Sequence, residues 1–338
     1  MTTPVYSVVI ATRNRPKDLL RAVESVLAQT MRSFELLVVD DGSEQEVTEL
    51  IAHSLESLSQ QTDIEIRYLR LGCYPRGRGP AYARNVGSWC SSGQYLAFLD
   101  DDDLWTDQGF LSKAYQVIGE QAEIDLLYAN QMAVPEGGGL EQPLWLHGLA
   151  KQLQQQGREF KDGCYRIFAE DLMAYQGFNH LNTTLVRREF FVDLGGFNEY
   201  LRYEEDLDFY LRCVDQAQVI LHLPEFVAQH HIPDASSGES ASLSLSRVQR
   251  LQIRRHLLSC NYVAAEKTVV RNKCRQHLLV TCKRLSHLLV DNGEFGPAYV
   301  SAKEALVYGM SLRWFAYTIY LGGRLLMLRA RYVVQRSF

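Results

Sequence analysis

The sequence has few of the patterns that mark secreted, disulfide-rich or zinc-binding proteins. Its seven cysteines are odd in number and show no C-x-x-C spacing, which argues against a disulfide framework and against a zinc site. The first residues, Met1 to Val5, lack the basic, apolar and small-residue order of a signal peptide. We therefore expect a reducing compartment, the cytoplasm, for this chain. Its 338 residues and 46% hydrophobic content suffice for one large or two ordinary cores.

Motifs of two common nucleotide-binding folds are also missing. The first predicted strand, 5–11, is followed by Thr-Arg-Asn-Arg instead of a G-x-G-x-x-G turn, which disfavours a nicotinamide or flavin site. No G-x-x-x-x-G-K-[ST] occurs, so P-loop ATPases and kinases are excluded. A nucleotidyltransferase is disfavoured as well, because it needs a Gly-rich turn after this strand.

Acidic residues are scarce in the last part of the chain. Residues 243–338 hold 16 Lys and Arg against 4 Asp and Glu, a net of +12, whereas residues 1–242 hold 19 against 36, a net of −17. A basic segment suits an anionic surface such as a membrane, or the acidic body of the same protein. No other feature supports a nucleic-acid partner, and we expect none.

Hydrophobic periodicity predicts strands that alternate with helices over the first 230 residues. Apolar runs indicate strands at 5–11, 34–39, 64–71, 95–99 and 182–186, and two short ones at 218–223 and 225–230. Helical periodicity covers 16–29, 44–58, about 80–88, 166–175 and 204–215. This order predicts an α/β fold with a doubly wound, mostly parallel, Rossmann-like sheet and helices on both faces. The Gly- and Gln-rich residues 135–163 are predicted to be a loop and an insertion at the edge of the sheet.

The pattern from residue 243 onward is almost entirely helical. Its segment 305–328 approaches the length of a membrane span, but Arg313, two paired glycines and several aromatic residues are more typical of a helix in the membrane interface. Packing on the protein body or on a second subunit produces the same periodicity. Two hypotheses therefore stay open: a peripheral position at the inner face of the cytoplasmic membrane, and a contact within the chain or in a homo-oligomer.

The most informative feature is the run of four aspartates, Asp100 to Asp103, directly after the apolar strand 95–99. Ligands of open α/β sheets bind at the carboxyl ends of the strands. Four like charges repel one another, and a divalent cation held by carboxylate oxygens would offset them beside an anionic nucleotide. The alternative is a solvated acidic loop or a helix N-terminus, which is the commoner case for an acidic run taken alone.

Two further segments place polar groups where a nucleotide could bind. Asp41 follows the strand 34–39 and suits hydrogen bonds from a base or a ribose, although a turn and helix cap favour the same residue type. The Gly-rich segment 76–87 carries Arg84, whose guanidinium can hold diphosphate oxygens or can simply face solvent.

Asp206 and the pair His230 and His231 complete the set of candidate residues. Asp206 begins a helix, where the dipole keeps a carboxylate ionised and able to accept a proton, or where it only caps the helix. The two histidines follow the last predicted strand and can offer an imidazole to a metal, although a surface position is commoner for such a pair.

In order and spacing, five segments resemble those of glycosyltransferase family 2, the inverting, nucleotide-sugar-dependent enzymes of the GT-A fold. They are Ser7-Val-Val-Ile-Ala-Thr-Arg-Asn-Arg15, Val39-Asp-Asp-Gly-Ser43, Ala83-Arg-Asn-Val-Gly87, Phe98-Leu-Asp-Asp-Asp-Asp103, and Gly195-Gly-Phe-Asn-Glu199 leading to Glu205-Asp206. The resemblance covers about residues 4–232. A single one of these motifs would be weak evidence for the family, but five of them in the same order are specific evidence. It implies a GT-A domain at 1–242, with a nucleotide-binding half to about 131 and an acceptor half from 132, followed by the basic helical region 243–338.

The resemblance also implies a role for single residues. Asp41 contacts the nucleobase with the help of the 11–15 turn, Arg84 shapes the nucleotide pocket, and Asp101 lies near the ribose. The implied nucleotide-binding set is Ala11, Thr12, Arg13, Arg15, Asp41, Arg84 and Asp101.

Metal and base positions follow from the same resemblance. Asp100 and Asp102 match the D-x-D positions, with Asp102 the most direct ligand of Mn²⁺ or Mg²⁺, and Asp206 matches the catalytic base. His231, in preference to His230, matches a histidine that reaches the metal or the diphosphate in some members. The following Ile-Pro-Asp departs from the family's shorter His-Pro/Gly-Gly-Ser pattern and leaves the register of the two histidines open.

The implied reaction is a single displacement that inverts the anomeric carbon. The expected donor is a nucleoside-diphosphate sugar, with a UDP-sugar favoured, and the expected acceptor is a hydroxyl of a glycan or lipid-linked molecule in cell-envelope polysaccharide biosynthesis. Processive synthases add a Q-x-x-R-W segment and several membrane spans, and neither is apparent. The competing hypothesis is a non-catalytic nucleotide- or glycan-binding module of the same fold, against which the intact Asp102 and Asp206 argue.

Overall fold

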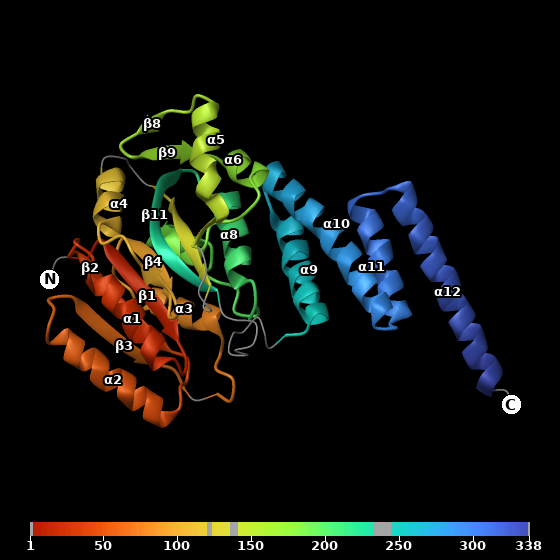
Figure 1. The fold of residues 1–338 in the computed structure, drawn as a ribbon, viewed down its shortest axis with the longest axis horizontal. Helices are drawn as coiled ribbons and strands as arrows, with labels where there is room; N and C mark the ends of the chain where they lie inside the picture. Colours follow the sequence, from red (N-terminus) through yellow and green to blue (C-terminus); the bar gives the residue numbers. More distant parts are fainter. Residues whose placement is uncertain (1–2, 73, 120–123, 136–140, 233–244, 337–338) are drawn as a thin grey trace. The chain divides into compact units, whose positions relative to one another are not determined.

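The computed structural model describes residues 3–72, 74–119, 124–135, 141–232 and 245–336. Its internal contacts divide the chain into two compact units, Met1–Ser237 and Gly238–Phe338 (Figure 1). The boundary expected after residue 242 falls within 233–244, outside the described residues. Each unit is considered by itself below.

The first unit is built on one sheet of eleven strands, in which the order along the main path is β3-β2-β1-β4-β10-β6-β11-β9-β8. The strands are β1 (Tyr6–Thr12), β2 (Phe34–Asp40), β3 (Glu65–Arg70), β4 (Tyr95–Asp100), β5 (Leu104–Trp105), β6 (Leu126–Pro135), β7 (Gln142–Leu144), β8 (Phe160–Lys161), β9 (Cys164–Ile167), β10 (Thr184–Arg187) and β11 (Ile220–Ile232). β1 to β4 run parallel, and β6 is parallel to β11. The expected α/β fold with a mostly parallel central sheet is confirmed.

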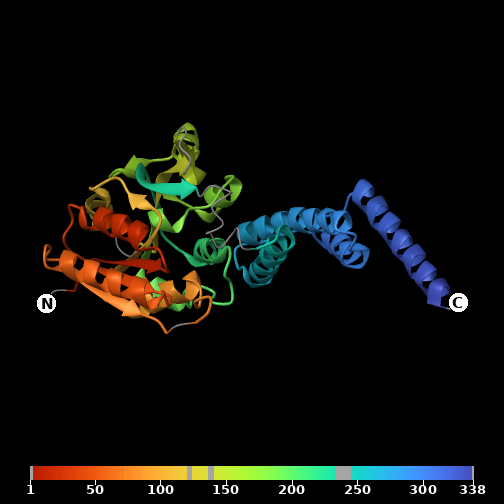
Figure 2. The ribbon, with the colours of Figure 1, turned by 60° about the horizontal axis from the view of Figure 1, so that its bottom comes forward.

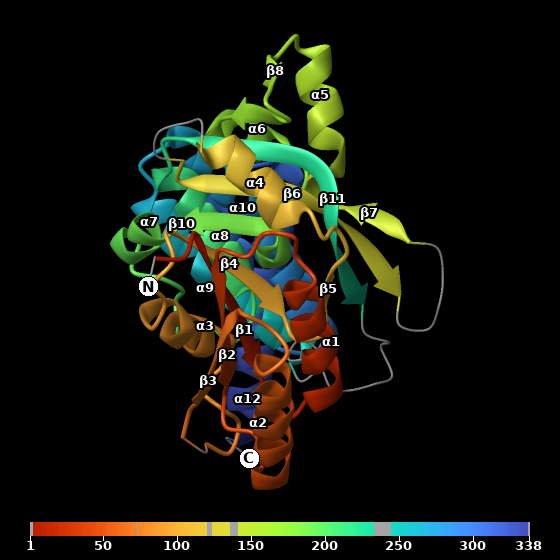
Figure 3. The ribbon, with the colours of Figure 1, turned by 90° about the vertical axis from the view of Figure 1, so that its left-hand side faces the viewer.

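The helices of this unit cover both faces of the sheet (Figure 3). They are α1 (Pro16–Leu27), α2 (Gln45–Ser59), α3 (Pro80–Trp89), α4 (Phe110–Gly119), α5 (Leu149–Gln155), α6 (Ala169–Ala174), α7 (Arg188–Asp193) and α8 (Glu205–Gln216), with 3-10 turns at Trp145–Gly148 and Leu181–Thr183. Alternate residues of a strand point to opposite faces, so Val8 and Ile10 of β1 join the core under α1 and α4, whereas Val9 faces Gly87 of α3.

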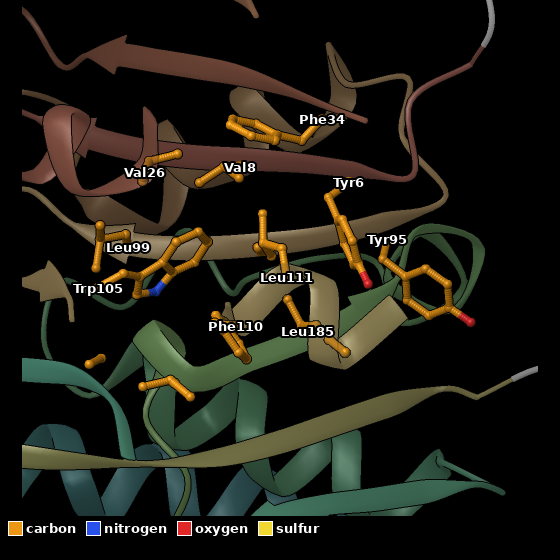
Figure 4. Close-up of a cluster of buried hydrophobic side chains, with 14 of the residues drawn as sticks. Tyr6, Val8, Val26, Phe34, Tyr95, Leu99, Trp105, Phe110, Leu111 and Leu185 are labelled. Carbon is orange, nitrogen blue, oxygen red and sulfur yellow. The ribbon is translucent and has the colours of Figure 1, made fainter. Parts of the chain in front are cut away.

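The core beneath α1 and α4 is apolar and aromatic (Figure 4). Tyr6 and Tyr95, on the paired strands β1 and β4, place their ring centroids 6.3 Å apart. Trp105 meets Phe110 edge to face at 5.2 Å and donates its indole hydrogen bond to the carbonyl of Asn182. This packing fixes the chain directly after the four aspartates, because Trp105 follows them by two residues.

Several expected elements differ from the structure. The two short strands at 218–223 and 225–230 are one strand, β11, which bulges between His222 and Phe226, where Pro224 cannot donate a ladder hydrogen bond. The predicted helix 166–175 is β9 followed by the shorter α6. The described part of 135–163 holds β7, a 3-10 turn, α5 and β8 at the sheet's margins. The long central strand β6 was not predicted at all.

The second unit consists of helices, as expected. They are α9 (Arg247–Ala264), α10 (Thr268–Asp291), α11 (Phe295–Tyr308) and α12 (Leu312–Arg336). α10 packs against α9 and α11, and α11 packs against α12, which forms one unbroken helix (Figure 2). The segment 305–328, expected as a single helical stretch, is interrupted at residues 309–311, since Gly309 ends α11. Among the described residues no helix combines the length and apolarity that crossing a membrane requires.

Candidate active site

The site lies where the carboxyl ends of the parallel strands β2, β1 and β4 meet. Thr12 pairs with Asp40 across β1 and β2, and Ala11 pairs with Asp100 across β1 and β4. The sheet register therefore brings the 11–15 turn, the aspartate pair at the end of β2 and the four aspartates into one region. This is the edge at which open α/β sheets bind ligands.

Arg15 neutralises part of the acidic cluster. Its Nη1 lies 2.7 Å from Asp102 and 3.2 Å from Asp101, and the hydroxyl of Thr12 donates to Asp101 at 2.7 Å. Burial raises the pKa of Asp101 to about 7 in spite of Arg15. Burial, together with the charges of Asp103 and Asp100, raises the pKa of Asp102 to about 6. Both carboxylates are therefore buried beside other aspartates, a setting in which a cation favours the ionised form.

Arg84 connects the acidic cluster to the helix α8. This arginine is 7% exposed, and its two terminal nitrogens lie 2.6 Å from Asp100 and 2.7 Å from Glu205. Burial alone would raise the pKa of Asp100, yet Arg84 and His180 hold it below its usual value. Arg84 thus lies between two carboxylates. Its guanidinium supplies part of the positive charge that we had expected from a metal cation.

Asp103 is fully buried and has its own set of partners. His230 Nδ1 lies 2.8 Å from one carboxylate oxygen, and the backbone N–H of His231 donates to the other at 2.7 Å. Burial opposes ionisation, but hydrogen bonds from these histidines hold the pKa of Asp103 well below its ordinary range. The amide of Asn182 donates to Asp103, and its oxygen accepts from the backbone of Asp100 at 3.0 Å. These contacts fix the backbone of the cluster.

Two groups of side chains bring potential metal-ligand atoms within 4.8 Å of one another. One consists of Asp100, Asp102 and Asp103, and the other of Asp103, His180 and His230. The oxygen donors of the first group suit Mg²⁺ or Mn²⁺, and the imidazoles of the second suit Mn²⁺ better than Mg²⁺. The residues present therefore fit a divalent cation. Of the two candidate histidines, the structure brings His230 rather than His231 into these groups.

His180 was not singled out from the sequence. It is 8% exposed, its Nδ1 makes no hydrogen bond, and its Nε2 lies 3.7 Å from Asp100. Burial lowers its pKa to about 4, so the imidazole is neutral near pH 7 and can offer a lone pair. A lone histidine in a loop has no spacing signal, which is why sequence patterns do not reveal it.

Trp145 reaches the same region from the segment 135–163, which was predicted to be a loop and an insertion at the sheet's edge. Its ring stacks on His180 at 5.0 Å with an interplanar angle of 10°, and its centroid lies 5.5 Å from that of His230. Its backbone has φ of 53°, a strained value for a bulky side chain. Gly177 permits this approach, because an added Cβ would lie 3.3 Å from Trp145 Cα. The inserted segment therefore contributes to the site.

Asp41 and Arg13 lie at the neighbouring Gly-rich loop. The two carboxylate oxygens of Asp41 accept hydrogen bonds from the backbone N–H groups of Arg78 and Gly79, each at 2.7 Å, while Arg13 donates to the carbonyl of Pro75 at 3.2 Å. Gly77 has φ of 63°, and a Cβ there would lie 2.3 Å from Asp41. Asp41 thus holds this loop against the end of β2, and the remaining lone pairs of its oxygens stay available to a ligand.

Asp206 lies in the first turn of α8, as expected. Burial raises its pKa to about 6, with Arg84 opposing and with Asp100 and Glu204 adding to the rise. It lies beside Tyr128, Thr184 and Tyr210, around a gap too narrow to admit a water molecule. Its neighbour in the sequence, Glu205, forms an ion pair with Arg84, and Arg84 forms a second one with Asp100 of the acidic cluster. Asp206 therefore lies next to the end of this chain of ion pairs.

Sequence comparisons relate the chain to known glycosyltransferases. The model of glycosyl transferase family 2 matches residues 7–174. An uncharacterised glycosyltransferase of Methanocaldococcus jannaschii is 25% identical over 254 residues, which cover 75% of this chain and 77% of that protein. One of Rickettsia felis is 41% identical over 99 residues, but these are 29% of this chain and only 15% of that protein. The succinoglycan biosynthesis protein ExoW of Rhizobium meliloti is 40% identical over 106 residues, 31% and 30% of the two chains.

Solved structures share the fold. S. aureus TarS in complex with UDP-GlcNAc superposes with a TM-score of 0.59 at 18% identity, over 90% of this chain and 89% of that chain. The mannosyltransferase PcManGT from Pyrobaculum calidifontis, in complex with GDP-Man and Mn²⁺, superposes with a TM-score of 0.58 at 16% identity, over 99% and 84%. These likenesses confirm the GT-A fold of the first unit. The match of the family model and the curated glycosyltransferase relatives show that residues 7–174 form a domain of glycosyl transferase family 2.

Proposed function

We propose that the protein is an inverting glycosyltransferase that moves a sugar from a nucleoside-diphosphate sugar to a hydroxyl of a glycan or lipid-linked acceptor. The observation that carries the proposal is the continuous set of charges from Asp206 and Glu205 through Arg84 to the four aspartates. This set contains a carboxylate of raised pKa, which suits a proton acceptor. It also contains a crowded acidic cluster, which suits a cation that assists the leaving group.

Each group has a distinct task in this reaction. Asp206 accepts the proton of the attacking hydroxyl while the new bond forms between the acceptor oxygen and the anomeric carbon. The bond from that carbon to the diphosphate oxygen breaks on the opposite face, and the nucleoside diphosphate leaves with the bonding electron pair. Attack from the face opposite the leaving group inverts the anomeric centre, so an α-linked donor yields a β-linked product.

The cation of this proposal is Mn²⁺ or Mg²⁺, held by Asp102 with Asp100 and with an imidazole of the His230–His231 pair. When bound, it neutralises the growing charge of the diphosphate as a Lewis acid. Arg15 and Arg84 position Asp102 and Asp100 for this task. Asp101, held by Thr12, lies at the end of β4 where a ribose would be bound.

Nucleotide recognition is assigned to the neighbouring strand end. Asp41 and the turn formed by Ala11, Thr12, Arg13 and Arg15 would contact the base, because they border the same edge of the sheet as the cluster. The complexes of TarS with UDP-GlcNAc and of PcManGT with GDP-Man support a nucleoside-diphosphate sugar as donor. Of these two nucleosides we favour uridine. The similarity to ExoW supports a product in polysaccharide biosynthesis, and hence a cytoplasmic enzyme that serves the cell envelope.

A panel of nucleotide sugars tests the proposal directly. The purified chain is incubated with each donor and Mn²⁺, and released nucleoside diphosphate is measured with and without a chelator. We expect metal-dependent release from one class of donor, its loss in Asp102→Asn, and its retention in Asp107→Asn, whose carboxylate binds Lys113 instead. Absence of release from every donor, with nucleotide binding intact, would favour the non-catalytic module.

A further inference from the structure

The helix α12 has two apolar faces, and only one of them is covered. Trp314, Thr318 and Leu321 are buried, and Trp314 donates its indole hydrogen bond to the carbonyl of Ala302 on α11 at 3.0 Å. Leu321 lies two positions after Ile319, which is about 200° around a helix. The side of α12 that carries Ile319 therefore points away from α10 and α11.

The uncovered side of α12, called here the outer face, is strongly apolar. Its exposed side chains are Leu312 (88% exposed), Phe315 (45%), Ile319 (61%), Tyr320 (56%), Leu326 (67%) and Met327 (60%). At about 100° per residue, these side chains fall within an arc of about 140° on one side of the helix. A contiguous apolar stripe of this kind is rare on a monomer and marks a surface that has a partner.

Positive charge borders the outer face. Arg313 and Arg324 are exposed and lie about 100° and 120° around the helix from Leu312. Arg324 also stays close to aromatic groups, with its guanidinium 4.5 Å from the ring centroid of Phe295 and a hydrogen bond to the hydroxyl of Tyr320 at 3.0 Å. The part of the chain from 243 to 338 carries a net charge of +12.

We propose that the outer face of α12 binds an anionic lipid membrane from one side, with the helix lying in the interface. An anionic bilayer supplies an apolar layer for Phe315, Ile319 and Leu326 and negative charge for Arg313 and Arg324. A second copy of the chain supplies the apolar partner but sets two net charges of +12 against each other. This inference goes beyond sugar transfer and does not depend on it.

Vesicle binding by the full chain tests the inference. Co-sedimentation is measured with vesicles of phosphatidylcholine alone and with vesicles that also contain phosphatidylglycerol. We expect binding to the anionic vesicles, weakened by salt. The triple variant Phe315→Ser, Ile319→Ser, Leu326→Ser should lower the partition coefficient by about a hundredfold, since each side chain loses part of its ~1.5–3 kcal/mol of burial.

A second variant separates charge from apolar insertion. Arg313→Gln with Arg324→Gln should weaken binding to anionic vesicles roughly 25-fold, because each arginine contributes about fivefold near such a surface. It should leave the weak binding to neutral vesicles unchanged. The matched control replaces exposed apolar residues on α2, α9 and α10, as Leu50→Ser, Val263→Ser and Val280→Ser, and should bind like the unmodified chain.

Contrary outcomes are distinct. Equal binding of the outer-face triple variant and the unmodified chain overturns the inference, and so does a failure of the unmodified chain to bind anionic vesicles. Light scattering without lipid detects the competing occupant: a dimer that the same triple variant dissociates, together with no vesicle binding, assigns the face to a second copy. Circular dichroism verifies that each variant is folded. Because no donor sugar is needed, these results are independent of the transferase assay.

Discussion

The two units of the chain differ in which kind of side chain they bury. In the first unit Arg84, Asp101 and Asp103 are 7%, 7% and 0% exposed. Each of them forms an ion pair or a hydrogen bond with another polar side chain at the strand ends. In the second unit the two arginines of α12 that border its outer face are exposed, and so are Ile319 and Leu326. Buried charge is costly unless it is paired, and exposed apolar stripes are costly in water.

This contrast indicates two kinds of partner. Paired charges at the ends of the strands suit a small, highly charged ligand, as a nucleoside diphosphate with its cation is. An apolar stripe with a basic border suits an extended surface. The catalytic proposal therefore depends on the pairing in the first unit, and the membrane inference depends on the exposure in the second.

The largest expected effect is on the rate of transfer. Asp206→Asn removes the proton acceptor but keeps the size of the side chain, so transfer should fall by roughly two to four powers of ten while donor binding is retained. Steady-state rates and calorimetric donor titration measure the two quantities. Asp208→Asn on the same turn is the control, because that carboxylate binds Arg212 at 2.9 Å; near-normal transfer by Asp206→Asn would refute the role.

The next effect is on stability and concerns the buried charges. Arg84→Met leaves Asp100 and Glu205 without their shared cation, and we expect a loss of about 3–5 kcal/mol in the free energy of unfolding. Urea unfolding followed by tryptophan fluorescence measures it. The exposed Arg324→Met should cost at most about 0.5 kcal/mol. Equal losses of unfolding free energy in the two variants would show that the buried, paired arginine contributes no more to stability than the exposed one.

A smaller effect is expected from pH. Since burial raises the pKa of Asp206 to about 6, the carboxylate is ionised above that pH and protonated below it, where it cannot accept a proton. The turnover number at saturating donor should therefore fall by about tenfold from pH 8 to pH 5. Burial has the largest influence on this pKa, and the backbone N–H of Leu207 opposes it. The charged groups that act on Asp206 are Arg84, Asp100, Glu204 and its neighbour Glu205. The residual turnover of Asp206→Asn should lack this dependence, and a parallel profile would assign the titration elsewhere.

Sequence periodicity predicts the part of the fold that consists of local patterns. The β-α-β opening and the strand 95–99 follow from runs of apolar residues, and the strand-end rule then places Asp41 and the four aspartates at one edge. The insertion of β10 between β4 and β6, and the long β6 itself, depend on non-local pairing that periodicity does not encode. The break at 309–311 was missed for a local reason: Gly309 ends α11, but the apolar residues on both sides of it were taken as one continuous helix.

The site was predictable only where charge clusters in sequence. The run of aspartates can be recognised in the sequence. The ion pair between Arg84 and Glu205 joins residues that are 121 positions apart, so only the structure shows it. From the sequence we expected a cation as the main counter-charge, whereas in the structure Arg15 and Arg84 supply part of it. His180 and Trp145 come from separate segments with no recognisable spacing, so their approach to the cluster is a result of packing.

The smallest expected effect concerns the outer face of α12 in the absence of lipid. Ile319→Ser should change the free energy of unfolding by no more than about 0.5 kcal/mol, since the side chain is 61% exposed and loses little packing. Leu321→Ser, on the buried face two residues away, is the contrast and should cost at least about 2 kcal/mol. Thermal or urea unfolding of the full chain measures both. If Ile319→Ser proves as costly as Leu321→Ser, the outer face is already covered by protein, and its exposure cannot be what distinguishes the second unit from the first.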